Sequence, residues 1–134
     1  MGYNQSMSYP EEFSTQSITG QFSELYYDRM LDTYVSRPRK GWVKVTPSVS
    51  TIVSTSTNTI YDMAGLIDSY YKLDNTGAFN ATVLIPSDSD MEPNNWTYTV
   101  TFGWGGPAIS YNAAELASGP IDVNDEYVPV DPTL

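Results

Sequence analysis

The sequence contains neither cysteine nor histidine, and these two absences exclude much of the chemistry that small domains commonly carry. Without cysteine there is no disulfide framework, no thiolate metal site and no cysteine nucleophile. Without histidine there is no Ser-His-Asp triad, no zinc site of the usual kind, and no general base of the type most often used near neutral pH.

Basic residues are scarce as well. Six Lys and Arg residues stand against sixteen Asp and Glu residues, so the formal charge is −10. A field of that sign repels a polyanion at long range, and we therefore expect no nucleic-acid partner. The four most closely spaced cations could contact an acidic surface or could lie in a solvated turn: Arg37, Arg39, Lys40 and Lys44.

Long apolar runs are also missing. No segment approaches the roughly 20 apolar residues of a membrane span. The first residues have neither the basic flank nor the apolar core of a signal peptide. We expect no membrane association and no secretion by that route.

Strands dominate what is present. Phe79, Ala81, Val83 and Ile85 alternate with more polar residues, which is typical of a strand buried on one face. A second alternation runs from 96 to 102, where Trp, Tyr, Val and Phe are separated by threonines. These two segments predict the centre of a β domain.

The pattern along the whole chain predicts about seven short strands in one domain of 134 residues. The turn 74–77 (DNTG) is expected to join strands 66–73 and 78–85 as a hairpin. Other expected strands are 17–22, 42–46, 108–111, 121–123 and 127–130, with an edge strand and loop in 48–59 and one helical turn in 113–117. This favours an all-β, mostly antiparallel β-sandwich, immunoglobulin-like or related, behind a polar N-terminal arm at 1–16.

Residues 23–35 have two interpretations. Leu25, Tyr26, Met30, Leu31, Tyr34 and Val35 recur at intervals that suit a short amphipathic helix behind an N-cap at Ser23. The alternative is a crossover loop packed by its own aromatic side chains.

Two sets of carboxylates are candidates for chemistry. Asp88, Asp90 and Glu92 alternate in one loop and could form an oxygen cage for calcium, although the spacing lacks the glycine and final glutamate of an EF-hand; the alternative is an acidic solvated loop. Glu115 with Asp122, or Asp125 with Glu126, could serve acid and base roles in glycoside hydrolysis. Because no pair is placed at the required separation, we expect no enzyme and no cofactor.

Eleven Tyr and three Trp residues are more than a core needs. Tyr and Trp anchor protein interfaces and also stack on sugars. Tyr26, Tyr27, Tyr34, Trp104 and Tyr111 are the expected surplus, and protein contact is favoured over carbohydrate. With the neighbouring Met30, the candidate partner-binding residues are Tyr26, Tyr27, Met30, Tyr34 and Trp104, the last as an exposed stacking platform between two glycines.

Three motifs carry a resemblance. The segments 41–48 (GWVKVTPS), 73–79 (LDNTGAF) followed by 83–86 (VLIP), and 96–100 (WTYTV) resemble a pattern in minor tail proteins of tailed phages that infect actinobacteria. The closing segments 121–123 and 128–130 are similar too. The resemblance implies a β-sandwich virion component over 17–130, with a short tail at 131–134 and no catalytic residues to carry over. This sequence departs from the family's pattern at 23–40, and that segment is a candidate insertion or docking segment.

The resulting expectation is a non-enzymatic structural protein of a tailed-phage virion, in the tail or tail tip, assembled in the cytoplasm of the host bacterium. Its partners would be other virion proteins and further copies of itself in a symmetric homo-oligomer, with a trimer as one form. One alternative is a capsid decoration protein that stabilises the head. Another is a module that binds a host surface receptor or glycan.

Overall fold

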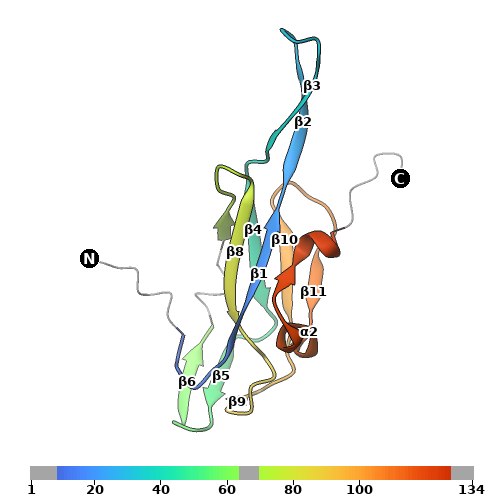
Figure 1. Cartoon of the computed structure of the whole chain (residues 1–134). Coiled ribbons are helices and arrows are strands. Elements are labelled where there is room, and N and C mark those ends of the chain that lie inside the picture. Colours follow the sequence, from blue (N-terminus) through green and yellow to red (C-terminus); the bar gives the residue numbers. More distant parts are fainter. Residues whose placement is uncertain (1–8, 64–69, 128–134) are drawn as a thin grey trace, which may run out of the picture.

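Two facing β-sheets form the body of the molecule in the computed structural model, which describes residues 9–63 and 70–127 (Figure 1). The first sheet has the order β12-β1-β8 and consists of β1 (Thr15–Gln21), β8 (Ala78–Leu84) and β12 (Ile121–Asp122). β8 runs antiparallel to β1 along its whole length, from Thr15 opposite Leu84 to Gln21 opposite Ala78. β12 runs parallel to β1 on its other side.

The second sheet has the order β11-β10-β4-β7. Its strands are β4 (Trp42–Pro47), β7 (Tyr70–Lys72), β10 (Tyr98–Phe102) and β11 (Ile109–Tyr111), and every pairing is antiparallel. The two sheets together contain seven strands, and each overlaps a segment expected to be a strand. The fold is therefore all-β and mostly antiparallel, as expected.

Alternating side chains from both sheets fill the space between them. Ile18, Phe79, Ala81 and Val83 come from the first sheet, and the second sheet contributes Val43, Val45, Tyr98, Val100 and Phe102; all are at least 95 % buried. The apolar faces predicted for 79–85 and 96–102 are thus confirmed except at the end of β8, where Leu84 is buried and Ile85, beyond the strand, is only half-buried. Close packing around β1 of the first sheet leaves no room at Gly20, where a β-carbon would lie 2.5 Å from Val123 Cγ2 and 2.8 Å from the Phe79 ring.

The hairpin predicted across 74–77 is wrong. Gly77 N donates to Asp74 O at 3.0 Å and Asp74 N donates to Ala78 O at 2.9 Å, so the tight turn itself is present. The strands on either side of it belong to different sheets, however, because β7 pairs with β4 and β8 pairs with β1. The turn carries the chain from one layer to the other. Residues 64–69 of the predicted strand lie outside the described residues.

A small third sheet closes one end of the body, with the order β6-β5-β9. It consists of β5 (Thr51–Ser54), β6 (Thr59–Asp62) and the short β9 (Met91–Glu92). The Ser- and Thr-rich tract at 48–59 forms a strand and a loop as predicted, but its strand, β5, is the central strand of this sheet and not an edge strand, because it pairs with β6 on one side and β9 on the other. Ile52 and Met91 bury their side chains beneath this sheet and extend the core to that end.

The C-terminal half ends in two short helices. α2 (Ala113–Ser118) fits the predicted helical turn and begins with a capping box, in which Asn112 and Glu115 bond to each other's backbone N–H groups. η2 (Val123–Asp125) follows β12 and buries Val123. Residues 128–130 of the last predicted strand lie outside the described residues.

The N-terminal arm predicted at 1–16 is too long at its inner end. Phe13 is buried in the core, Tyr9 donates from its hydroxyl to Thr82 O at 2.7 Å, and β1 already begins at Thr15. The segment is mostly polar, so its composition does not predict that Tyr9 and Phe13 attach its inner end to the body. Residues 1–8 lie outside the described residues.

The helix or packed loop predicted at 23–35 is wrong. These residues form most of a two-stranded antiparallel hairpin, β2 (Ser23–Asp28) and β3 (Thr33–Pro38), which projects from the end of the body opposite the β6-β5-β9 sheet (Figure 1). The spacing of apolar residues fits a helix and a strand equally here. The strand is favoured by the many Tyr, Thr and Val residues and by the turn chemistry at 28–32.

Candidate functional site: a projecting hairpin

The tip of the hairpin is shaped by two aspartates. Asp28 accepts at Oδ1 from the backbone N–H groups of Met30 and Leu31, at 2.9 and 3.2 Å, which closes the turn in the manner of an Asx-turn. Asp32 has the left-handed φ of 53° and accepts from the Tyr27 hydroxyl. These contacts hold Met30 and Leu31 outward, and their side chains are 95 % and 65 % exposed.

One face of the hairpin makes its own polar and aromatic contacts. Arg37 Nε donates to Glu24 Oε2 at 2.6 Å, and these two residues lie opposite each other in the register. The Arg37 guanidinium also lies 4.0 Å from the centre of the Tyr26 ring. The side chains of this face cover one another.

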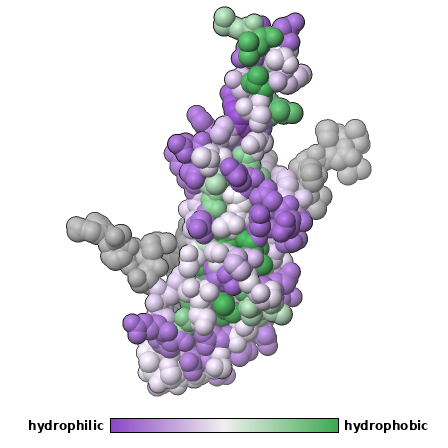
Figure 2. All heavy atoms as spheres, viewed as in Figure 1, coloured by the Kyte–Doolittle hydropathy of each residue, from purple (hydrophilic) through white to green (hydrophobic). Residues whose placement is uncertain are grey.

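The other face is apolar and uncovered. Leu25, Tyr27 and Tyr34 point to it and are 73 %, 44 % and 68 % exposed. The Tyr27 and Tyr34 rings meet edge to face, with centroids 5.4 Å apart. Figure 2 shows hydrophobic residues in green along the projecting end, beside hydrophilic ones in purple. We call Leu25, Tyr27, Met30, Leu31 and Tyr34 the apolar hairpin face.

The root of the hairpin is fixed to the body by backbone contacts. Phe22, the residue between β1 and β2, donates from N to Gly77 O at 2.9 Å and accepts at O from Arg39 N at 3.0 Å. Gln21 Nε2 donates to Thr76 O at 3.2 Å. The 74–77 turn is thereby hydrogen-bonded to the residues at which the hairpin leaves the first sheet.

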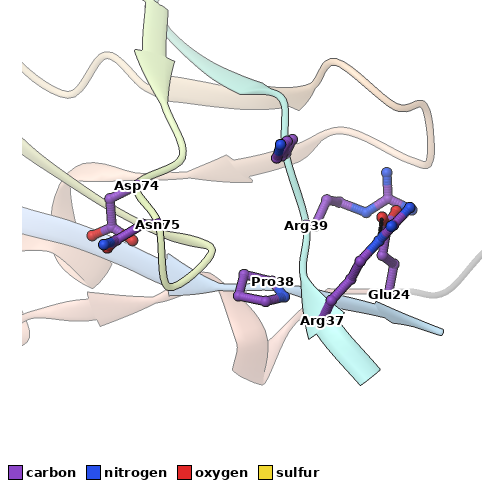
Figure 3. A pocket seen from close by; sticks show the side chains of 7 residues that line it. Glu24, Arg37, Pro38, Arg39, Asp74 and Asn75 are labelled. Atoms are coloured by element: carbon purple, nitrogen blue, oxygen red, sulfur yellow. Dashed lines mark hydrogen bonds and ion pairs between the residues drawn. The ribbon is translucent and has the colours of Figure 1, made fainter. Parts of the chain in front are cut away.

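A shallow pocket of about 320 Å³ lies beside this root (Figure 3). It is lined by Glu24, Arg37, Pro38, Arg39, Lys40, Asp74 and Asn75. The Thr76 hydroxyl, followed by the amides of Ala78 and Thr76, donates to Asp74 and lowers the pKa of that carboxyl. Three cations against two carboxylates leave this part of the surface basic.

Trp104 is not the exposed platform that the flanking glycines suggest. Its ring packs on Phe22 and Phe102, with centroids 4.9 and 5.3 Å apart, and its indole Nε1 donates to the Tyr127 hydroxyl at 3.0 Å. The Arg39 guanidinium lies over the same ring at 4.8 Å. Trp104 thus belongs to the body beneath the hairpin root. Four of the five predicted partner-binding residues lie on the hairpin, but Tyr27, Met30 and Tyr34 belong to its apolar face whereas Tyr26 lies on the opposite face against Arg37.

The exposed tryptophan is Trp42, on the outer face of β4. It is 40 % exposed, meets the ring of Tyr70 on β7 edge to face at 5.0 Å, and leaves no space for a side chain at Gly103. Lys44 Nζ lies 5.1 Å from the Tyr70 ring centre. Sequence reasoning missed this pair, although the alternation of 42–46 already places Trp42 and Lys44 opposite the buried Val43 and Val45.

The acidic loop does not gather its carboxylates around one point. Asp88 accepts at Oδ2 from Ser14 N at 2.8 Å and at Oδ1 from Asp90 N at 3.0 Å, so both of its oxygens hold backbone amides. Glu92 lies on β9 opposite Val53. Within residues 9–63 and 70–127, no group of three or more carboxylates is arranged to hold a metal ion.

The carboxylates considered for acid and base roles have structural partners. Glu115 closes the capping box of α2, and Asp122 accepts from Asn124 N at 3.0 Å at the start of η2. Tyr111, predicted as a surface aromatic, is only 1 % exposed, and burial followed by the nearby Glu126 raises the pKa of its hydroxyl. Tyr111 is therefore a core residue.

Among the described residues no helix is long and apolar enough to cross a membrane. No family model, curated protein or solved structure matches this chain. The function must therefore be argued from the hairpin and the surfaces around it.

Proposed function

We propose that this chain is a non-enzymatic structural component of a tailed-phage virion, in the tail or tail tip, and that it attaches to its neighbours through the β2-β3 hairpin. The observation that supports attachment through the hairpin is its exposed apolar face. Exposed apolar patches on projecting elements mark contact sites, because their burial against a partner is favourable.

The hairpin supports this proposal through its stability as well. A two-stranded hairpin alone is marginal in water, and this one extends beyond the body with one face uncovered. A partner that covers the apolar hairpin face would stabilise the hairpin and gain a specific contact in one step. The virion assignment rests on the resemblance of the segments 41–48, 73–79 and 96–100 to minor tail proteins.

The proposal is tested by electron microscopy of phage particles assembled with a C-terminally tagged copy of this chain. We expect label at the tail end with the wild-type chain, and loss of label with Leu25→Ser/Tyr34→Ser. A control variant, Thr33→Ser on the other face of the hairpin, should keep the label. Label spread over the head would replace the tail assignment with capsid decoration. No label on any particle would contradict a virion role.

A second candidate function, glycan binding, is favoured by the Trp42 and Tyr70 rings. Their perpendicular arrangement offers a floor and a wall for a sugar ring, with Lys44 beside them as a donor. Titration of the protein with host cell-wall fragments, followed by tryptophan fluorescence, tests it. Binding should vanish with Trp42→Ala and persist with Leu25→Ser; unchanged binding with Trp42→Ala would exclude this surface.

A further inference from the structure

The outer face of the second sheet carries lysines and no carboxylate on its four described strands. Its outward positions alternate with the buried ones, and the register places them side by side. They are Trp42, Lys44 and Thr46 on β4, Tyr70 and Lys72 on β7, Thr99 and Thr101 on β10, and Ser110 on β11. This face is therefore positively charged in a protein whose net charge is −10.

Two exposed aromatic rings lie together on this face. Trp42 and Tyr70 meet edge to face, with ring centroids 5.0 Å apart. A β-carbon at Gly103 would lie 2.5 and 2.7 Å from Cε2 and Cδ2 of Trp42, the two carbons that the rings of the indole share. These carbons are nearest only when the indole is approached from its face. The indole therefore lies flat on the Gly103 backbone, and its exposed part is on the side away from the sheet.

Both lysines lie beside these rings. Lys72 is opposite Trp42 in the register and Lys44 is opposite Tyr70, with Lys44 Nζ 5.1 Å from the centre of the Tyr70 ring. Within residues 9–63 and 70–127, neither ammonium group forms an ion pair. The face thus combines stacking surface with two cations that no carboxylate of the described chain neutralises.

The carboxylate that follows β7 is already engaged. Asp74 comes two residues after Lys72, but its Oδ1 accepts from the Thr76 hydroxyl at 2.6 Å and from Ala78 N at 3.1 Å. Another cation, Lys40, lines the same pocket as Asp74. The charge of Asp74 is therefore offset locally, and the positive charge on the sheet face remains.

From this combination we infer that the outer face of the second sheet binds a saccharide that carries carboxylate or phosphate groups. The C–H face of a sugar ring stacks on Trp42, and Lys44 and Lys72 hold the anionic group. The hydroxyls of Thr99 and Thr101 offer hydrogen bonds to the rim of the sugar. This inference rests on glycan binding, the second candidate function, and names the class of glycan.

Other occupants match this face less well. A protein partner would bury aliphatic side chains such as the exposed Leu25 and Leu31 of the apolar hairpin face, whereas hydroxyl and ammonium groups surround the two rings here. A neutral saccharide would stack on the rings but would leave both ammonium groups without a counter-charge. An acidic saccharide satisfies the rings, the hydroxyls and the cations together.

Binding of the full chain to an array of acidic saccharides tests the inference. Oligogalacturonates are placed beside their methyl esters, and phosphomannans beside the same polymers after dephosphorylation, so that each pair differs in charge. We expect at least tenfold tighter binding of the charged member, and the pair that shows it identifies carboxylate or phosphate as the anion. Equal binding of charged and neutral members would overturn this inference and leave the glycan candidate standing. Binding of no saccharide would overturn both, and equally tight binding of polyglutamate would overturn the saccharide.

Three variants separate the contributions of charge and stacking. Lys44→Gln/Lys72→Gln should weaken binding of the acidic saccharide at least tenfold and leave binding of its neutral counterpart unchanged. Gly103→Ala should weaken both, because the new β-carbon displaces the indole of Trp42. Gly103 does not have a positive φ, so this variant should keep a melting temperature near that of the wild type. Arg29→Gln removes a cation at the hairpin tip and should leave binding unchanged. Binding at wild-type strength by Lys44→Gln/Lys72→Gln would overturn the inference.

Discussion

Gly77 lies directly against the backbone of Phe22, so that a β-carbon at residue 77 would overlap the Phe22 carbonyl oxygen. Gly77 also has a φ of 82°, in the region that side chains disfavour. The same two residues are joined by the hydrogen bond from Phe22 N to Gly77 O. This contact determines where the hairpin leaves the body.

Gly77→Ala should therefore destabilise the protein strongly. We expect a loss of about 2 kcal/mol or more in the free energy of unfolding, because both the backbone conformation and the close approach are disturbed. Urea denaturation followed by tryptophan fluorescence measures it. Asn75→Ala, at an exposed position of the same turn, should change stability by less than about 0.5 kcal/mol. Equal effects of the two changes would contradict the role assigned to Gly77.

Stability should fall at alkaline pH through buried tyrosines. Burial raises the pKa of Tyr9 to about 12 and raises that of Tyr98 further above the ordinary value of 10. The stability due to the neutral form is fully present below pH 10 and is lost as pH rises above it, by up to about 1.4 kcal/mol per pH unit for each such group. Tyr98→Phe should make the loss less steep in urea titrations between pH 9 and about 11.

The matched control is Tyr34→Phe, which removes the hydroxyl of an exposed ring. In this variant the free energy of unfolding should fall with pH as steeply as in the wild type. If the fall is equally steep in Tyr98→Phe, ionisation of Tyr98 is not coupled to unfolding. Measurements at each pH are compared only after refolding is shown to be reversible.

The ion pair on the hairpin should matter little. Glu24 and Arg37 are partly exposed, and pairs of this kind contribute roughly 0–1 kcal/mol. Glu24→Gln should leave the melting temperature within about 2 °C of the wild type. It should also leave the label on phage particles nearly unchanged, whereas Leu25→Ser, one residue further on and on the opposite face, should reduce that label at least tenfold. A larger effect of Glu24→Gln than of Leu25→Ser would show that the contact lies on the polar face of the hairpin.

Calcium should have no effect on stability. Both oxygens of Asp88 hold backbone amides, and Glu92 lies on a strand outside that loop. Differential scanning calorimetry with millimolar calcium and with a chelator should give the same melting temperature. A rise with calcium that Asp90→Asn removes would restore the metal site considered from the sequence.

The parts of the fold that could be predicted are those in which one physical pattern dominates. Strands β8 and β10 bury one face over most of their length, and the alternation of their residues leaves no competing interpretation. Residues 23–35 differ because their apolar side chains are exposed, so burial does not select between a period of 3.6 and a period of 2. In this segment the turn formed by Asp28 and Asp32 favours a hairpin over a helix, and the spacing of the apolar residues alone does not reveal that turn.

Pairing partners were harder to predict than strands. The turn 74–77 has the composition of a hairpin loop, yet Leu73 and Phe79 both bury their side chains in the core between the sheets. The strands on either side nevertheless pair in different sheets, β7 with β4 and β8 with β1, and the composition of a turn does not encode which sheet the next strand joins. The candidate site shows the same limit: the tyrosines of the hairpin could be named from the sequence, whereas the exposure of Trp42 and the burial of Trp104 depend on contacts with distant residues such as Gly103 and Phe22.

The parallel pairing of β12 with β1 has a consequence for biosynthesis. β1 is complete when residue 21 leaves the ribosome, but its partner on one side, residues 121–122, is made a hundred residues later. Until then β1 exposes an open edge to other nascent chains. We therefore expect the pairing of β12 with β1 to form late, and a chain truncated before Ile121 should aggregate during translation rather than accumulate as a shortened domain.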